Sequence, residues 1–235
     1  MPTMEVRLAY FKQRLSTAWR PVKGVDVIPT TENRYLFQFN HKNDAENVLN
    51  DRPWTYDNCN LVIERISPGM VPKNVCLDFM NIWVQVHNLP YGFIQLKVGE
   101  AIGKYLGELV EYDSKHLVQS MFMKLKVCIN VTQPLKQELK VCTAGGEWIQ
   151  ILFKYERLDN FCYACGILSH TDCACEMLYD QEHDDGTRAW GASLKPVARK
   201  MGTAGSNKWL RDIVKGESSG VCNKTDEPAN VPENV

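Results

Sequence analysis

Four residues that can bind a metal lie close together in the sequence, and they constrain the fold more than any other feature. The stretch FCYACGILSHTDCACE places Cys162, Cys165, His170 and Cys175 in the spacing C-x2-C-x4-H-x4-C. Zinc takes four nitrogen or sulfur ligands in a tetrahedron, and two cysteines separated by two residues can bind it from one tight turn. Gly166 supplies backbone freedom just beyond that turn. Because four protein ligands leave no position for water, the sequence predicts one structural Zn²⁺ rather than a hydrolytic centre.

Cys173 lies inside the last gap of this pattern and offers an alternative fourth ligand, with the spacing C-x2-C-x4-H-x2-C. We favour Cys175, because a return of only two residues from His170 gives the chain less reach to complete the tetrahedron. The cysteine count is odd, at nine, and the N-terminal stretch has no uninterrupted apolar core like that of a signal peptide. We therefore expect an intracellular protein, nuclear or cytoplasmic, rather than a secreted disulfide framework.

Residues 1–67 predict a first small module of two helices and three strands. Leu8, Phe11, Leu15 and Trp19 recur at steps of three or four, which indicates an amphipathic helix. The further expected elements are strands at 25–28 and 34–39, a helix that begins at Asn43 and is capped with the help of Glu46, and a strand at 61–66. This order resembles a βαββαβ sandwich that lacks its first strand.

The aromatic side chains of Tyr35, Phe37 and Phe39 alternate along one strand of this module. Such a stripe resembles the base-stacking surface of an RNA-binding sheet, but alternating aromatic residues more often face a core. We therefore expect these three rings in the core of the first module.

Residues 68–157 predict a second mixed module, which follows the turn residues Ser67 to Pro72. We expect a strand at 81–87, a helix around residues 98–105 with Gly107 at its C-cap, and strands at 108–113, 121–131 and 146–155. Along 121–131, apolar residues alternate with a face that carries Lys124 and Lys126. The predicted fold class is α+β: two small mixed modules, a zinc knuckle at 158–178 and a flexible tail at 179–235.

Charge is strongly segregated along the chain, although the formal net charge is only −1. Residues 158–187 contain seven Asp and Glu residues and no Lys or Arg, whereas residues 188–215 contain seven Lys and Arg residues and one acidic residue. An acidic block followed by a basic block indicates that the basic block is a polyanion-binding arm and that the neighbouring acidic module has a different role. No apolar run is long enough for a membrane-spanning helix, so no membrane partner is expected.

The cysteine and histidine spacing resembles the CCHC zinc knuckle of retroviral nucleocapsids and retrotransposon proteins. The surrounding chain resembles a plant family derived from non-LTR retrotransposons, in which an N-terminal domain of unknown function precedes a single knuckle. The similarity spans roughly residues 6–200. The stretches that carry it are NRYLFQF (33–39), RPWTYD (52–57), IWVQVHNLP (82–90), IG (102–103), LGE (106–108), YERL (155–158) and FCYACG (161–166).

This resemblance implies zinc binding and single-stranded nucleic-acid binding, to RNA or DNA. In a knuckle, an aromatic and an aliphatic side chain form a platform for an unpaired base, and Tyr163 with Ile167 or Leu168 match those positions. The chain departs from the family at Ser169, where knuckles usually carry glycine, and in the acidic surround of the site. Phosphate contacts would therefore come from basic residues elsewhere: Lys124, Lys126, Arg188, Lys195, Arg199 and Lys200.

The sequence contains neither a GxxxxGK[ST] phosphate loop nor an HExxH motif. We therefore expect a non-enzymatic protein of retrotransposon origin that binds single-stranded nucleic acid and has no small-molecule substrate. The alternative is a protein-interaction module in which the zinc site only stabilises the fold. A third reading is a degenerate fragment of a mobile element without a selected function.

Overall fold

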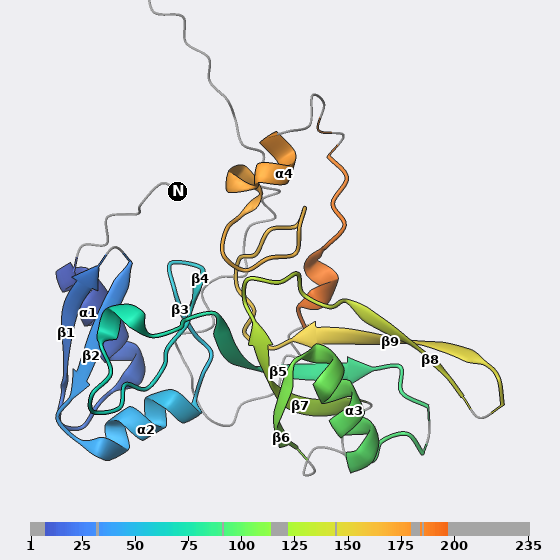
Figure 1. The fold of residues 1–235 in the computed structure, drawn as a ribbon, viewed down its shortest axis with the longest axis horizontal. Coiled ribbons are helices and arrows are strands. Elements are labelled where there is room, and N and C mark those ends of the chain that lie inside the picture. Colours follow the sequence, from blue (N-terminus) through green and yellow to red (C-terminus); the bar gives the residue numbers. More distant parts are fainter. Residues whose placement is uncertain are drawn as a thin grey trace, which may run out of the picture. The chain divides into compact units, whose positions relative to one another are not determined.

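The computed structural model describes residues 8–31, 33–90, 92–113, 122–143, 145–179, 184 and 186–196 (Figure 1). Helices and strands are mixed within both modules, which confirms the predicted α+β class. The chain divides into two compact units, Met1–Ala198 and Arg199–Val235, and the second lies outside the described residues. None of the helices in the described part is long and apolar enough to cross a membrane.

The first module packs helix α1 (Leu8–Trp19) against the antiparallel hairpin of β1 (Val25–Thr31) and β2 (Arg34–Phe39). The apolar stripe of α1 is buried, because Phe11, Leu15 and Trp19 all lie on the helix face that meets the hairpin. The ring of Phe11 lies 4.7 Å from that of Tyr35, and the ring of Trp19 lies 4.9 Å from that of Phe37. The aromatic stripe of β2 is therefore part of this core, as expected.

The rest of the first module differs from the prediction. Instead of a strand at 61–66, a short hairpin pairs β3 (Trp54–Tyr56) with β4 (Cys59–Leu61) as a separate two-stranded sheet. Asp57 and Asn58 have φ values of 53° and 59°, and this left-handed pair is the backbone conformation that a two-residue hairpin turn requires. The turn signal, rather than the apolar run that follows it, therefore decides where the strands lie.

Helix α2 (Lys42–Asn50) begins one residue earlier than predicted. His41 is its N-cap, and the ring Nδ1 accepts a hydrogen bond from the backbone N–H of Asn43 at 3.1 Å. The capping by Asn43 and Glu46 that the sequence suggested is therefore wrong, because the imidazole already accepts a donor of the first turn.

The second module is a five-stranded antiparallel sheet with helix α3 packed on one face (Figure 1). Its elements are β5 (Phe79–His87), α3 (Leu96–Leu106), β6 (Glu108–Tyr112), β7 (Met123–Asn130), β8 (Glu138–Cys142) and β9 (Trp148–Tyr155), and the strand order is β6-β7-β5-β9-β8. Gly107 is the C-cap of α3, as predicted. A side chain there would overlap the backbone carbonyl of Cys128, so the close approach of β7 requires glycine.

Strand β8 was not predicted, because it lies at the sheet edge, where its residues are exposed or only half-buried and carry no strong apolar signal. The core beneath α3 is formed by the inward-facing side chains of the strands, among them Ile82, Val84, Leu125 and Val127. On β7 the alternation is as expected, with Met123, Leu125, Val127 and Ile129 buried.

The core of the second module continues past the end of the sheet. Leu158, Phe161 and Leu194 are buried in the same cluster as the strand residues. The short elements in this part of the chain are the 3-10 turns at Asp172–Ala174 and Ala192–Leu194 and the single-turn helix α4 (Glu176–Tyr179); a further 3-10 turn, Pro72–Asn74, precedes β5. Residues 186–196 therefore differ from the predicted flexible tail at 179–235, since an aliphatic side chain from them is part of the core.

Candidate metal centre

Three thiols and one imidazole converge between β9 and α4. The ligand atoms of Cys162, Cys165, His170 and Cys175 all lie within 4.8 Å of one another. A tetrahedral zinc with Zn–S bonds of about 2.3 Å separates its sulfur ligands by about 3.8 Å. The Cys165 Sγ and the His170 Nε2 lie 3.3 Å apart. The spacing and the soft donor set both fit Zn²⁺.

The first two ligands come from a tight turn that begins directly after the buried Phe161. The N–H of Gly166 donates to the carbonyl of Cys162 at 2.8 Å, and the N–H of Cys162 donates to the carbonyl of Ile167 at 3.0 Å. Gly166 has a φ of +77°, a conformation that favours glycine. This turn therefore brings Cys162 and Cys165 to the same side, as the spacing predicts.

The last two ligands arrive from the returning chain. The Nδ1 of His170 lies 3.0 Å from the Ser169 hydroxyl, so that its Nε2 faces the cluster. The 3-10 turn Asp172–Ala174 then brings Cys175 inward, where it is 1% exposed, whereas Cys173 is exposed. The structure thus places Cys175, and not Cys173, among the four converging ligands.

Burial also sets the electrostatics of the cluster. It raises the pKa of the Cys162 thiol, because a thiolate in this surround would lose its hydration. A divalent cation reverses that preference, since zinc binds thiolates. The residues are therefore suited to release thiol protons when the metal binds.

Trp190 supports the turn from outside. Its indole lies against Gly166, where any side chain would overlap the ring. The indole N–H donates to the carbonyl of Leu135 at 2.9 Å, and the N–H of Leu135 donates to the carbonyl of Gly166, also at 2.9 Å. The metal-binding turn is thus joined to both the β7–β8 segment and residues 186–196. The sequence analysis did not identify Trp190. A single tryptophan within a polar stretch could have indicated a buried contact there.

A charged network holds the other side of the turn. One carboxylate oxygen of Asp172 accepts a hydrogen bond from the N–H of Tyr163 at 2.6 Å, and the other pairs with the Nε of Arg188 at 2.8 Å. Arg188 also pairs with Asp184 at 2.7 Å. These two carboxylates raise the pKa of the Arg188 guanidinium, and the same guanidinium lowers the pKa of Asp184 to about 2.

The side chains predicted to form a platform for a base pack against other parts of the protein. Tyr163 and Leu168 are half-buried and pack against the core of the second module. The ring of Tyr163 lies 4.7 Å from that of Phe161. Ile167, the other aliphatic candidate, packs against the cysteine cluster.

The predicted phosphate contacts are dispersed rather than gathered at the knuckle. On the sheet, Lys124 pairs with Glu156 at 2.8 Å and Lys126 donates to the carbonyl of Asn50 at 3.2 Å. Both ammonium groups also lie beside the ring of Trp83, at 4.9 and 5.6 Å from its centroid.

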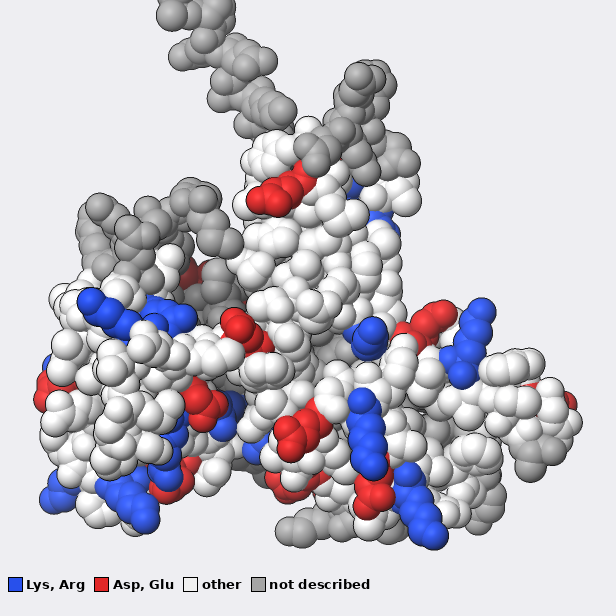
Figure 2. Space-filling view, viewed as in Figure 1, with Lys and Arg blue, Asp and Glu red and all other residues white. Residues whose placement is uncertain are grey.

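Near the knuckle, Arg188 is paired with two carboxylates, and Lys195 lies 6.0 Å from the ring of Phe161. Arg199 and Lys200 lie outside the described residues. On the face that Figure 2 shows, basic and acidic side chains of the described residues are interspersed.

Comparisons with known proteins agree with this arrangement. Residues 6–74 match a family model described as a domain of unknown function (DUF4283), and residues 129–177 match one described as a zinc knuckle. No curated protein and no solved structure matches the chain. The zinc-knuckle match begins at the end of β7 and includes β8 and β9, so the strands and the metal-binding turn are matched together. In the order predicted from the sequence, the chain therefore joins an N-terminal DUF4283 domain of unknown function to a CCHC zinc knuckle.

Proposed function

We propose that the chain is a non-enzymatic protein that binds single-stranded RNA or DNA and that one structural Zn²⁺ is required for this binding. The observation that carries the proposal is the convergence of four ligand atoms in a segment that matches a zinc knuckle. Zinc knuckles present unpaired bases to aromatic and aliphatic side chains. The architecture also supports an origin in a non-LTR retrotransposon, as the family resemblance implies.

The proposed zinc is structural because three thiolates and one imidazole complete its tetrahedron. The metal-binding turn already packs on the core through Phe161 and Leu168, and in comparable peptides metal binding itself supplies an apparent ~10–16 kcal/mol. Without the metal we expect the turn, and the contacts that Trp190 and Arg188 make with it, to loosen together. Zinc removal should therefore reduce nucleic-acid binding even where zinc touches no nucleotide.

An intracellular site of action, nuclear or cytoplasmic, is part of the proposal. Cys59, Cys76 and Cys142 are free and exposed in the structure. Exposed free thiols suit a reducing compartment, where glutathione and thioredoxin keep them reduced.

A protein-interaction module is the second candidate, and a specific observation favours it. Tyr163 and Leu168 pack against the core, and Arg188 is neutralised by Asp172 and Asp184. The aromatic side chain and the nearest cation of this knuckle already have intramolecular partners. Fewer of its groups are therefore free to contact a nucleotide. In this reading the zinc only fixes the fold.

Fluorescence anisotropy of labelled single strands separates the two candidates. The purified full chain, with and without zinc, is titrated into short RNA and DNA oligonucleotides at several salt concentrations. Nucleic-acid binding predicts zinc-dependent affinity that falls as salt rises, because phosphate contacts release counterions. Salt-independent or absent binding by the zinc-loaded chain would support the protein-interaction reading instead.

Tyr163 gives a second, local test. Tyr163→Phe keeps the ring, and Tyr163→Ala removes it. If the ring stacks on a base, Tyr163→Ala weakens binding by ~1–3 kcal/mol with unchanged metal content. If its role is to pack on Phe161, the alanine variant instead lowers zinc content and thermal stability, while the phenylalanine variant preserves both.

A further inference from the structure

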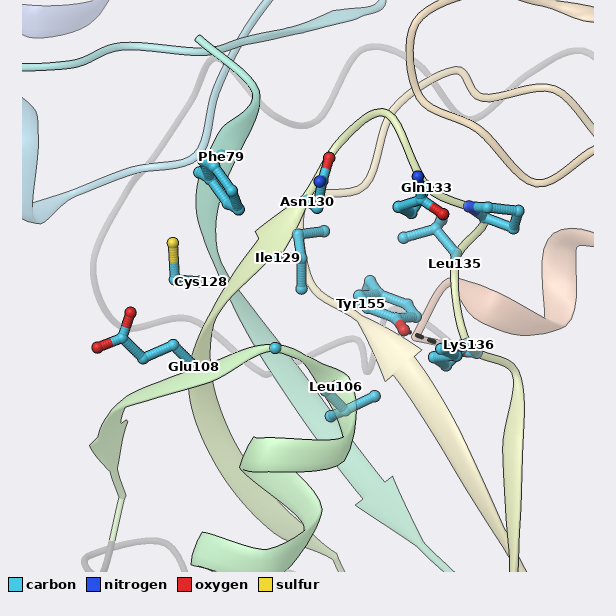
Figure 3. Close-up of a pocket in the computed structure, with 12 residues that line it drawn as sticks. Phe79, Leu106, Glu108, Cys128, Ile129, Asn130, Gln133, Leu135, Lys136 and Tyr155 are labelled. Atoms are coloured by element: carbon cyan, nitrogen blue, oxygen red, sulfur yellow. Dashed lines mark hydrogen bonds between the residues drawn. The ribbon is translucent and has the colours of Figure 1, made fainter. Parts of the chain in front are cut away.

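Two cavities lie at the end of the second-module sheet, next to the metal-binding turn. The first, of about 310 Å³, is open to solvent and is lined by the start of β5, the ends of β7 and β9 and the start of β6 (Figure 3). The second, of about 300 Å³, lies beside Tyr105 and Trp190. Residues 133–136 line both, so this segment separates one cavity from the other. Their volumes lie at the lower end of the range of small-ligand sites, and both open to solvent, the second more widely than the first.

The walls of the first cavity suit a flat aromatic ligand. Figure 3 shows Leu106, Ile129 and Leu135 around its interior, with Phe79 at one side. Phe79 is 50% exposed although it begins the central strand of the sheet, so about half of its surface remains accessible to a ligand. An exposed ring beside an apolar cavity is the arrangement on which an unpaired base stacks.

Polar groups at the rim can read the edge of such a base. The carbonyl oxygen of the Asn130 side chain accepts hydrogen bonds from the N–H and hydroxyl of Thr132, which fixes this amide and leaves its NH₂ group as a donor. The exposed side chain of Gln133 offers a second amide. Glu108 also lines the cavity, and Figure 3 shows its carboxylate pointing away from the interior.

Charge favours a base inside the cavity and a phosphate outside it. Lys136 is exposed and lines both cavities, and its ammonium lies 5.6 Å from the ring centroid of Tyr105, which is 41% exposed in the second cavity. Carboxylates from Glu108 and Glu138 line the first and second cavities. These carboxylates repel phosphate from the interiors of the cavities. Lys136 attracts phosphate to the ridge between the two cavities, which is formed by residues 133–136.

Zinc is coupled to this ridge through Leu135. The Leu135 N–H donates to Gly166 in the metal-binding turn, and its carbonyl accepts from the indole of Trp190. The segment that separates the cavities is thus held by the same turn that supplies Cys162 and Cys165. Residues 129–137 also lie within the zinc-knuckle match.

We propose that these two cavities take successive bases of a single-stranded nucleic acid, with the intervening phosphate at Lys136. This inference rests on the proposed function and places the contact at the end of the sheet, away from the packed ring of Tyr163. Zinc acts on it indirectly, by fixing residues 133–136. Stacking comes from Phe79 in the first cavity and from Tyr105 in the second, where the Lys136 ammonium leaves the Tyr105 ring when it binds the phosphate.

The test compares variants of the zinc-loaded full chain in anisotropy titrations with short mixed-sequence RNA and DNA. Phe79→Ala should weaken binding at least about fivefold, and Phe79→Tyr, which keeps the ring, should restore it. Lys136→Ala should weaken binding and lower the slope of log K against log salt by about 0.7. Lys140→Ala is the matched control, because Lys140 is exposed on β8 and lines neither cavity.

The outcomes separate this inference from the proposed function. If wild type binds and the Phe79→Ala and Lys136→Ala variants bind as tightly as Lys140→Ala, the cavities are not the site, while nucleic-acid binding stands. If wild type binds neither oligonucleotide, both proposals fall. Should Phe79→Ala lose its zinc or its fold, Lys136→Ala decides, because its truncated side chain is exposed and its backbone carbonyl still accepts from Tyr155.

Discussion

The indole of Trp190 lies against Gly166 so closely that a β-carbon at position 166 would overlap the ring. Gly166 belongs to the metal-binding turn and Trp190 to a later segment, and the indole N–H of Trp190 also donates a hydrogen bond to the carbonyl of Leu135 in the β7–β8 connection. A bulky ring and a glycine are thus complementary here. The knuckle is held to the sheet by packing as well as by its metal ligands.

Gly166→Ala should destabilise the protein by about 2 kcal/mol or more. The new methyl group overlaps Trp190, and alanine at a φ of +77° costs roughly 1–2 kcal/mol by itself. Urea unfolding of the zinc-loaded chain measures the change. Gly69→Ala is the matched control, because Gly69 has a φ of +91° but no neighbour within 4 Å. Equal losses in the two variants would show that the contact with Trp190 contributes nothing.

Metal content should follow the four converging ligands. We expect close to one zinc per chain after dialysis, and His170→Ala and Cys175→Ser should each lose most of it, since three ligands bind zinc less tightly than four. Cys173→Ser should retain it, because Cys173 is outside the converging set. Loss of zinc in Cys173→Ser but not in Cys175→Ser would reverse the assignment of the fourth ligand.

The pair of Asp172 and Arg188 should contribute a measurable coupling energy. Both side chains are about three-quarters buried, and Asp172 also accepts from the N–H of Tyr163. A double-mutant cycle with Asp172→Asn and Arg188→Ala should give a coupling of about 1 kcal/mol in unfolding free energy. The cycle uses zinc-loaded protein throughout. Additive effects would mean that the ion pair stabilises nothing beyond the separate side chains.

Asp44 should make the first module sensitive to acid. Its Oδ2 accepts from the backbone N–H of Lys23 at 3.0 Å, and this hydrogen bond is the largest cause that lowers the pKa of the carboxyl group. A depressed folded-state pKa stabilises the fold above the unfolded value of about 3.9, and the stabilisation is lost as pH falls through the folded value. The stability difference between wild type and Asp44→Asn should therefore be greatest near neutral pH and shrink on acidification. A pH-independent difference in urea unfolding would contradict this.

Truncation should be designed from the packed chain rather than from the charge pattern. Removing residues 197–235 deletes Arg199, Lys200 and other basic residues but keeps Trp190 and the buried Leu194. We expect this deletion to lower single-strand affinity and flatten its salt dependence, with no loss of zinc. Deletion from residue 188 should also lower zinc content, because it removes Trp190 and Arg188. An unchanged salt slope after the shorter deletion would place the phosphate contacts within residues 1–196.

Local sequence chemistry predicted several features correctly. The periodic spacing of Phe11, Leu15 and Trp19 indicates α1, and the strict alternation on β7 indicates which of its faces is buried. These patterns are readable because each element must bury one apolar face, whatever its partner. The C-x2-C pair of metal ligands is equally local, since a single turn brings Cys162 and Cys165 together.

Elements with weak apolar patterns were not predictable in the same way. Strand β8 is a half-exposed sheet edge, and the β3–β4 hairpin depends on the left-handed conformations of Asp57 and Asn58. The start of α2 depends on a histidine side chain that accepts a backbone hydrogen bond. In each case a turn, a cap or a neighbouring strand decides where the element begins or ends. Hydrophobic periodicity does not indicate these boundaries.

The sequence by itself determined the ligand types, the C-x2-C turn and the glycine that this turn needs, because these are local, whereas the structure decided between Cys175 and Cys173 as the fourth ligand. Only the tertiary structure decided what surrounds that site. Long-range packing brings Leu135 and Trp190 onto the turn, engages Tyr163 with the core, pairs Arg188 with acidic residues and opens two cavities beside the ridge at Lys136. These contacts join residues far apart in the chain, and their selection depends on how whole elements pack, which no short stretch of sequence encodes.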